Sequence, residues 1–281
     1  MMSIFKGRKL VIATKHGKEE VIAPVLESRL EVECFVPDNF DTDSLGTFTG
    51  EVERATDPLT TARKKCLLAM EISNCDLAIA SEGSFGAHPT IPFIPADDEW
   101  MFFMDKKNGL EIYARELSTE TNFSAQAVKS KEELIYFAER AKFPSHALIL
   151  RKSHEESIDI IKVIKDWVFL DKSFTGINKK YQEVFVETDM RAMYNPTRMA
   201  VISMAAEKLA AKISTCCPKC NTPGFGIMDA KLGLLCEWCG TPTRSVLSYI
   251  YRCTKCSFTK EDLYPNKKKV EEPRFCDICN P

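Results

Sequence analysis

Eight cysteines near the end of the sequence are arranged as four Cys-x-x-Cys pairs. The pairs are Cys217/Cys220, Cys236/Cys239, Cys253/Cys256 and Cys276/Cys279. Each such turn can present two thiolates to one ion, and two turns complete a tetrahedral Cys₄ zinc site. The pattern predicts two structural Zn²⁺ ions, whose binding supplies much of the folding free energy of so small a unit. A closed Cys₄ site has no open coordination position, so we expect no catalysis there.

The spacing leaves open how the four pairs combine. Sequential use, first with second and third with fourth, gives two zinc ribbons, and residues 249–252 are predicted as a ribbon strand leading into Cys253. Interleaved pairing, in which the first pair combines with the third and the second with the fourth, also gives four cysteine ligands to each of two ions. Cys216 is left over beside a ligand, and we do not expect it to bind metal.

A second candidate site lies within residues 76–89. The apolar run 77–80 is long enough for one buried strand, and Ser81, Glu82 and Gly83 follow it. Ligands of open α/β sheets bind at the carboxyl ends of strands, where glycine permits close approach and a carboxylate can hold a metal ion. A plain turn with a solvated glutamate explains the same residues equally well. The choice between a ligand site and a turn therefore depends on the residues of the neighbouring elements.

One cationic segment precedes this stretch. Residues 10–14 predict a strand that ends in a loop carrying Lys15, His16 and Lys18, and a helical pattern follows. A helix N-terminus at this position can help to bind an anion. Two solvated lysines on a surface loop are the alternative.

A second cationic segment lies on the next predicted helix. Asp57 and Pro58 predict its start, with Asp57 as the N-cap. Arg63 and its neighbours Lys64 and Lys65 lie in the first two turns, where cations are disfavoured by the helix dipole unless an anion is near. A solvated basic face explains them equally well.

Strands and helices alternate along the rest of the chain. Further strands are predicted at 32–36, 100–104, 110–116, 146–150 and 184–188, and Asn108-Gly109 predicts a hairpin between two of them. Further helices are predicted at 130–141, from Ser153 through Trp167, and from Asn195 to about residue 213. The polar loop 37–50 is long enough to be functional. We therefore expect an α/β domain over residues 1–213, with a mixed sheet and flanking helices, followed by a zinc-binding domain over residues 214–281.

Composition limits the function classes. The 281 residues are 44% hydrophobic and 28% charged, with a formal net charge of −2, which gives no general attraction to nucleic acid or membranes. No apolar run is long enough to span a bilayer and no signal peptide is visible, so we expect a cytoplasmic protein. From Cys216 onward ten Lys and Arg face seven Asp and Glu, formally +3. Eight thiolates and two Zn²⁺ ions bring this charge to about −1.

Nearly the whole chain resembles an uncharacterised bacterial domain family with a cysteine-rich C-terminus. The match is carried by residues 61–66, 80–86 and 94–99 and by the ending at 276–281. Because such a family has no established activity, this resemblance implies no function for the chain.

Residues 8–213 also resemble the inosine/xanthosine triphosphate pyrophosphatases. The match is carried by residues 11–18, 57–65 and 78–83, by the strand at 184–186 and by the helix that bears Arg198. The resemblance implies their fold and a Mg²⁺-assisted attack of water on a nucleotide α-phosphate that releases pyrophosphate. It further implies the following roles: Glu82 and Asp57 hold Mg²⁺, Lys15, Lys18 and Arg63 bind phosphate, and Arg198 or Arg191 faces the base or the phosphates. Lys64 stands where those enzymes carry a neutral amide, and Asn195-Pro196-Thr197-Arg198 replaces their Ser-His-Arg signature.

Two functions are therefore expected. The leading one is Mg²⁺-dependent hydrolysis of a nucleoside triphosphate or related phosphorylated ligand. The alternative is a noncatalytic protein whose α/β domain senses a small ligand and whose zinc ribbons dock a protein or nucleic acid, with protein favoured by the near-neutral charge of the metal-loaded tail.

Overall fold

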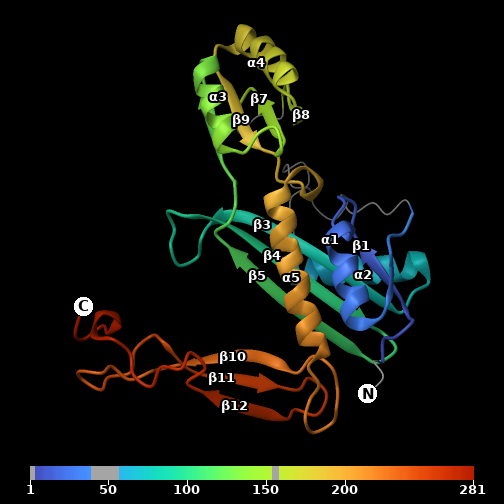
Figure 1. Cartoon of the computed structure of the whole chain (residues 1–281), viewed down its shortest axis with the longest axis vertical. Coiled ribbons are helices and arrows are strands. Elements are labelled where there is room, and N and C mark those ends of the chain that lie inside the picture. Colours follow the sequence, from blue (N-terminus) through green and yellow to red (C-terminus); the bar gives the residue numbers. More distant parts are fainter. Residues whose placement is uncertain (1–3, 39–56, 154–157) are drawn as a thin grey trace. The chain divides into compact units, whose positions relative to one another are not determined.

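The computed structural model describes residues 4–38, 57–153 and 158–281 (Figure 1). The chain forms two compact units, Met1–Ala210 and Ala211–Pro281. Helix α5 (Pro196–Ser214) continues from the first unit into the second. No helix in the described ranges has the length and apolar character needed to cross a membrane.

The first unit contains a mixed five-stranded sheet. In spatial order its strands are β2 (Glu33–Phe35), β1 (Lys9–Ala13), β3 (Leu77–Ala87), β4 (Pro95–Asp105) and β5 (Leu110–Ser118). Strand β1 is parallel to β2 and β3, whereas β4 is antiparallel to β3 and β5. Helix α1 (Glu19–Leu30) follows β1, and α2 (Pro58–Ser73) precedes β3. The chain thus leaves β1 toward β2 on one side and returns to β3 on the other, so the ends of β1 and β3 form a topological switch point.

Helix α2 begins where the sequence predicts. The Asp57 carboxylate accepts a hydrogen bond from the Thr60 backbone N–H at 3.1 Å, and Pro58 occupies the first helical position. The helix buries Ala62, Cys66 and Met70 against apolar side chains of β1, β3 and β4. This packing fixes which face of the sheet lies against α2.

Strand β3 is longer than predicted. The sequence predicts a strand over 77–80 and then a loop, but all eleven residues of β3 pair with β4, from Leu77↔Asp105 to Ala87↔Pro95. Glu82 and Gly83 therefore lie within a strand. Since Ala13, the last residue of β1, pairs with Ala80, they still lie beyond the end of β1.

A four-stranded antiparallel sheet completes the first unit. Its spatial order is β6 (Ala125–Val128), β9 (Val184–Thr188), β7 (Leu148–Arg151) and β8 (Ile161–Ile164). It has its own core, to which α3 (Lys131–Arg140) and α4 (Trp167–Tyr181) contribute (Figure 1). The N-cap predicted at Ser130 is confirmed, because its side chain accepts from the Glu133 backbone N–H at 3.2 Å. The Glu133 carboxylate accepts from the Lys129 backbone N–H at 2.7 Å, one residue before the cap.

The helix predicted from Ser153 through Trp167 is wrong. Residues 161–164 form strand β8, which pairs with β7, and the helix starts only at Trp167. The Asp166 side chain caps it by accepting from the Phe169 backbone N–H at 2.7 Å. Residues 154–157 of the predicted helix lie outside the described residues, as does loop 37–50 from residue 39 onward.

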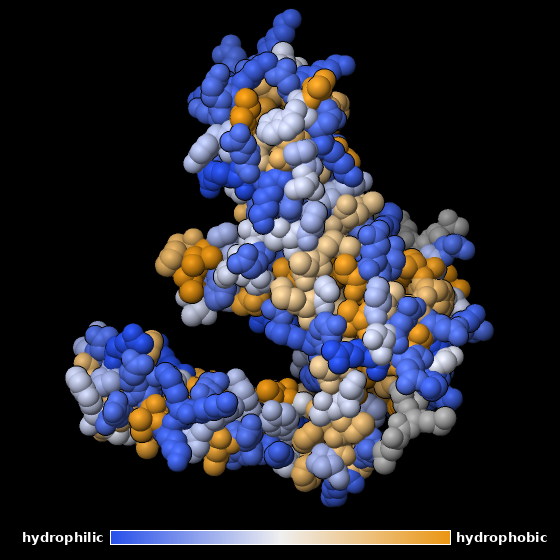
Figure 2. All heavy atoms as spheres, in the orientation of Figure 1, coloured by the Kyte–Doolittle hydropathy of each residue, from blue (hydrophilic) through white to orange (hydrophobic). Residues whose placement is uncertain are grey.

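The second unit contains a three-stranded antiparallel sheet in the order β10 (Gly226–Leu232), β11 (Val246–Arg252) and β12 (Thr259–Leu263). The described residues also include the short 3₁₀ helices η2 (Ala192–Tyr194), in the first unit, and η3 (Pro273–Phe275), in the second. In the first unit, Figure 2 shows apolar surface at the turn between β3 and β4, where Phe93 is 84% exposed.

Candidate metal centres and a charged site at the switch point

The structure gathers the eight paired cysteines into two sets of four. One set is Cys217, Cys220, Cys253 and Cys256, and the other is Cys236, Cys239, Cys276 and Cys279. Within each set all sulfur atoms lie within 4.8 Å of one another. The pairing is therefore interleaved, and the sequential ribbons are not formed.

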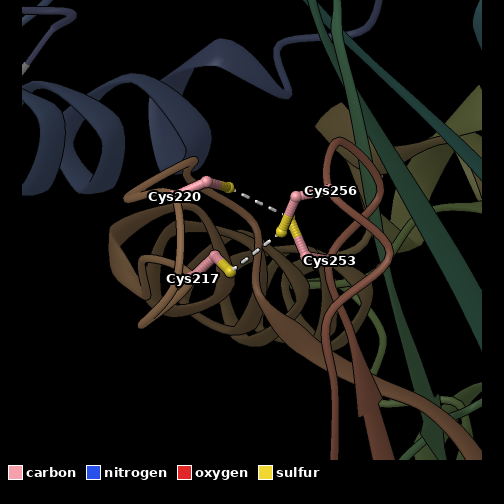
Figure 3. Close-up of side chains that lie close together, drawn as sticks. All are labelled: Cys217, Cys220, Cys253 and Cys256. Atoms are coloured by element: carbon pink, nitrogen blue, oxygen red, sulfur yellow. Dashed lines mark hydrogen bonds between the residues drawn. The ribbon is translucent and has the colours of Figure 1, made fainter.

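The sulfur geometry fits tetrahedral zinc. In the first set Cys217 and Cys256 are 3.7 Å apart and Cys220 and Cys253 are 3.5 Å apart (Figure 3). The corresponding distances in the second set are 3.9 and 3.6 Å. A tetrahedral ion with Zn–S bonds of 2.3 Å separates its sulfur ligands by about 3.8 Å. The second unit thus contains two Cys₄ clusters that could each hold a structural zinc ion.

The same backbone turn builds each half-site. The residue after the second cysteine of every pair donates its N–H to the carbonyl of the first cysteine, over 2.8 to 3.1 Å. Three of these residues adopt positive φ, namely Asn221, Gly240 and Ser257. Asparagine and glycine tolerate this left-handed conformation.

A threonine supports one thiolate in each set. The Thr222 hydroxyl lies 3.2 Å from the Cys220 sulfur, and this hydrogen bond lowers the pKa of Cys220 to about 6. Thr241 lowers the pKa of Cys239 to about 6 in the same way. Both threonines belong to a repeated Cys-x-x-Cys-x-Thr-Pro pattern in the first two pairs, a sequence signal that marks these two half-sites as equivalent.

Acidic and basic side chains meet at the switch point. On the face of β3 that lies against α2, the Glu82 carboxylate forms an ion pair with Lys65, and both side chains are largely buried. Lys65 projects from α2 two turns after its start. The predicted site residue Glu82 therefore has a partner that spacing alone does not single out from Arg63 and Lys64.

Lys18 reaches the opposite face of β3. Its ammonium donates to the Ser81 hydroxyl at 3.0 Å and lies 3.4 Å from the Ser81 carbonyl oxygen. Burial lowers the pKa of Lys18 to about 8, and the positive charges of Arg198 and Lys65 act in the same direction. Adjacent residues of a strand point to opposite faces, so Ser81 and Glu82 bring one lysine to each side of the sheet.

A buried ion pair lies on the Lys18 face. The Arg198 guanidinium donates to Glu99 of β4 at 2.7 Å, with neither side chain exposed, and also donates to the Met190 carbonyl. Gly83 pairs with Glu99, and a Cβ at Gly83 would lie only 2.2 Å from the Glu99 carboxylate. A side chain at this position would therefore displace the buried Glu99–Arg198 pair.

Asp97 is the most unusual group on this face. It is 0% exposed, and both carboxylate oxygens have no hydrogen-bond partner among the described residues. Burial, reinforced by the negative charge of Glu99, raises the pKa of Asp97 to about 8. The carboxyl group is therefore largely protonated at neutral pH.

The remaining predicted site residues do not join this cluster through the contacts seen. Asp57 is engaged as the helix cap, and it precedes Lys65 by eight residues, about 12 Å along the helix axis. Arg63 forms an exposed bidentate pair with Glu111, with its closest contact at 2.8 Å. Lys15 is exposed in the loop after β1.

The start of α5 is held by side chains from elsewhere in the unit. The Asn195 side chain accepts from the Arg198 backbone N–H at 3.0 Å and donates to Asn122 at 2.8 Å. The His146 Nε2 accepts from the Thr197 backbone N–H at 3.2 Å. These caps orient Arg198, and an isolated histidine in the sequence gives no signal for such a role.

A family model described as a domain of unknown function, DUF6671, matches residues 65–281. The chain belongs to this family. The match covers Glu82, Asp97, Glu99, Arg198 and all eight cysteine ligands, and it begins at Lys65. No curated protein matches the chain. Membership in DUF6671 therefore assigns no activity.

Proposed function

We propose that the switch-point site of this DUF6671 protein binds the phosphate groups of a nucleoside triphosphate or a related phosphorylated ligand and hydrolyses it with Mg²⁺. The observation that carries the proposal is the placement of Lys18 and Lys65. They contact consecutive residues of β3, Ser81 and Glu82, just beyond the end of β1. That is the edge at which open α/β sheets bind ligands.

The energetics of Lys18 favour an anionic ligand. A pKa lowered from 10.5 to about 8 costs about 3 kcal/mol for the charged ammonium. A phosphate group near Lys18 would remove that cost, because an adjacent negative charge stabilises the ammonium. Lys15, at the exposed end of the same loop, would meet the outer phosphates.

The described residues fit Mg²⁺ only in part. Apart from the cysteine sets, they contain no group of three acidic, histidine or cysteine side chains close enough to share an ion. Glu82 fits as one ligand, because Mg²⁺ is usually bound by one or two carboxylates together with substrate phosphates and water. When bound, the ion would polarise the phosphoryl group under attack. The Lys65 ammonium, which pairs with Glu82 in this structure, would then donate to a phosphate oxygen of the ligand.

The test is turnover by the zinc-loaded full-length chain. A panel of nucleoside triphosphates with Mg²⁺ is assayed for release of pyrophosphate and phosphate, and Glu82→Gln is expected to abolish release. Lys65→Met is expected to weaken binding about 10- to 100-fold, the loss of one charge-assisted hydrogen bond. Lys64→Met and Glu139→Gln, both at exposed positions, serve as matched controls. Absence of turnover and of binding across the panel would refute the proposal.

A second candidate function is docking of a protein through the zinc unit. It is favoured by Trp238 and Ile278, which are 77% and 66% exposed and occupy equivalent places inside the two Cys-x-x-Cys turns of the second cysteine set. The first set has Lys219 and Lys255 at these places. A Trp238→Ser, Ile278→Ser variant that keeps its zinc but loses a co-purifying partner would support docking, and an unchanged partner profile would refute it.

A further inference from the structure

Beside Glu82 the sheet carries an aromatic and cationic group. Trp100 is the cross-strand partner of Glu82, and Arg115 is the cross-strand partner of Trp100. Directly paired residues project to the same face of a sheet, with Cβ atoms about 5 Å apart. Glu82, Trp100 and Arg115 therefore form one row on the α2 side, immediately next to the Lys65 ion pair.

The row has the geometry of a stacking surface. The Arg115 guanidinium lies over the Trp100 ring at 5.0 Å from its centroid and is held in place by two hydrogen bonds to Asp98, at 2.7 and 2.9 Å. The Tyr113 ring is 6.2 Å from Trp100. Trp100 and Tyr113 are only partly buried, and the Arg115 side chain is 41% exposed. Planar groups are thus fixed in position while part of their surface stays open.

We propose that Trp100, Tyr113 and Arg115 bind the nucleobase of a nucleotide whose phosphates occupy the switch point. This inference rests on the proposed phosphate site and adds the class of ligand, one that carries an aromatic base. Bases stack on aromatic rings and on arginine guanidinium planes, and stacking tolerates any base because each has a π-face. The stacking group is separated from the Glu82–Lys65 ion pair by a single cross-strand step, so one small ligand can contact both.

The alternative is that these side chains only cover the sheet. In that case Trp100 contributes packing, and a ligand would be recognised by its phosphates alone. The two cases differ in whether a base adds affinity and in whether that gain depends on an aromatic ring at position 100.

The experiment measures binding of ATP, CTP and inorganic tripolyphosphate to the zinc-loaded full-length chain by calorimetry, without added Mg²⁺ so that hydrolysis is suppressed. Both nucleotides are expected to bind about 5- to 100-fold more tightly than tripolyphosphate, the gain typical of one stacked base. Trp100→Leu is expected to remove that gain and leave tripolyphosphate affinity unchanged, and Trp100→Phe is expected to retain most of it. Trp167→Leu, at a partly exposed tryptophan of α4, is the matched control.

The outcomes separate the two proposals. Equal affinity for all three ligands, unchanged in Trp100→Leu, overturns the base site and leaves the phosphate site standing. A loss of tripolyphosphate binding together with the nucleotides in both Trp100 variants shows a structural role and also overturns it. No binding of any ligand to the wild-type protein refutes the phosphate site as well.

Discussion

Replacing Asp97 with asparagine is expected to stabilise the protein at neutral pH, contrary to the usual effect of a substitution in a buried cluster. The Asp97 carboxyl group is fully buried without a hydrogen-bond partner among the described residues, and its pKa is raised to about 8. The charged groups on its face are Glu99, Arg198 and Lys18, and the adjacent Asp98 acts on it from the other face of the sheet. Asparagine has nearly the same shape as the protonated acid and carries no proton that ionises.

The magnitude follows from proton linkage. In the unfolded chain Asp97 ionises near pH 3.8, whereas in the folded protein it keeps its proton up to about pH 8. Between these values the folded state binds more protons than the unfolded state, so the free energy of unfolding falls as the pH rises. About 3 pH units at 1.36 kcal/mol per unit gives a loss on the order of 4 kcal/mol at pH 7. Asp97→Asn removes this loss.

Urea unfolding at pH 6, 7 and 8, followed by tryptophan fluorescence with zinc present, measures the effect. The free energy of unfolding of the variant should exceed that of the wild type by an amount that grows by about 2 to 3 kcal/mol over this range. Asp98→Asn is the control on the adjacent residue, whose pair with Arg115 is partly exposed and worth at most about 1 kcal/mol. A difference that is flat with pH, or a variant that is less stable than the wild type, would mean that Asp97 is ionised and stabilised by Lys18 and Arg198.

Two further substitutions test the zinc centres and the buried ion pair. Metal analysis should find two zinc ions per chain, and Cys220→Ser should lower this to about one, because a site that loses one of its four ligands binds zinc much more weakly. A content of zero in freshly purified wild-type protein would refute both sites. Gly83→Ala should lower the free energy of unfolding by about 3 kcal/mol in urea titrations, because the new Cβ would lie 2.2 Å from Glu99 and 2.5 Å from Arg198 and would break their pair. Gly86→Ala on the same strand meets no atom within 4 Å and should change stability by less than about 1 kcal/mol, so equal effects of the two substitutions would contradict this account.

The elements that the sequence predicts correctly are those whose signals are local. The caps at Asp57 and Ser130 and the turn at Asn108-Gly109 involve residues within a few positions of one another, and each appears as predicted. Strand β3 is longer than predicted because its second half is held in an extended conformation by pairing with β4. The residues from 81 onward carry no local sequence signal for that pairing. Residues 161–164 are mispredicted because isoleucines at this spacing suit a helix as well as a strand, and pairing with β7 makes them a strand.

In the candidate sites too, features that depend on local spacing are predicted from the sequence, whereas those that depend on long-range packing are not. The cysteine ligands follow from type and spacing, because a Cys-x-x-Cys turn is complete within four residues. Of the adjacent cations of α2, Lys65 pairs with Glu82, whereas Arg63 pairs with Glu111 of β5. That choice depends on the rotation of α2 against the sheet. The roles of Asp97 and Glu99 depend on the register between β3 and β4, so neither could be read from residue type.

The interleaved zinc pairing has a simple cause in the three strands between the cysteine pairs. Strand β10 lies between the first and second pairs, β11 between the second and third, and β12 between the third and fourth. Because the strands are antiparallel neighbours, each one carries the chain from one end of the sheet to the other. Successive cysteine pairs therefore alternate between the two ends, so the first meets the third and the second meets the fourth. Each zinc ion would then close a loop that contains one half of the other site, since Cys236 and Cys239 lie between the ligands of the first set and Cys253 and Cys256 lie between those of the second. We therefore expect the two sites to fold together as one cooperative unit.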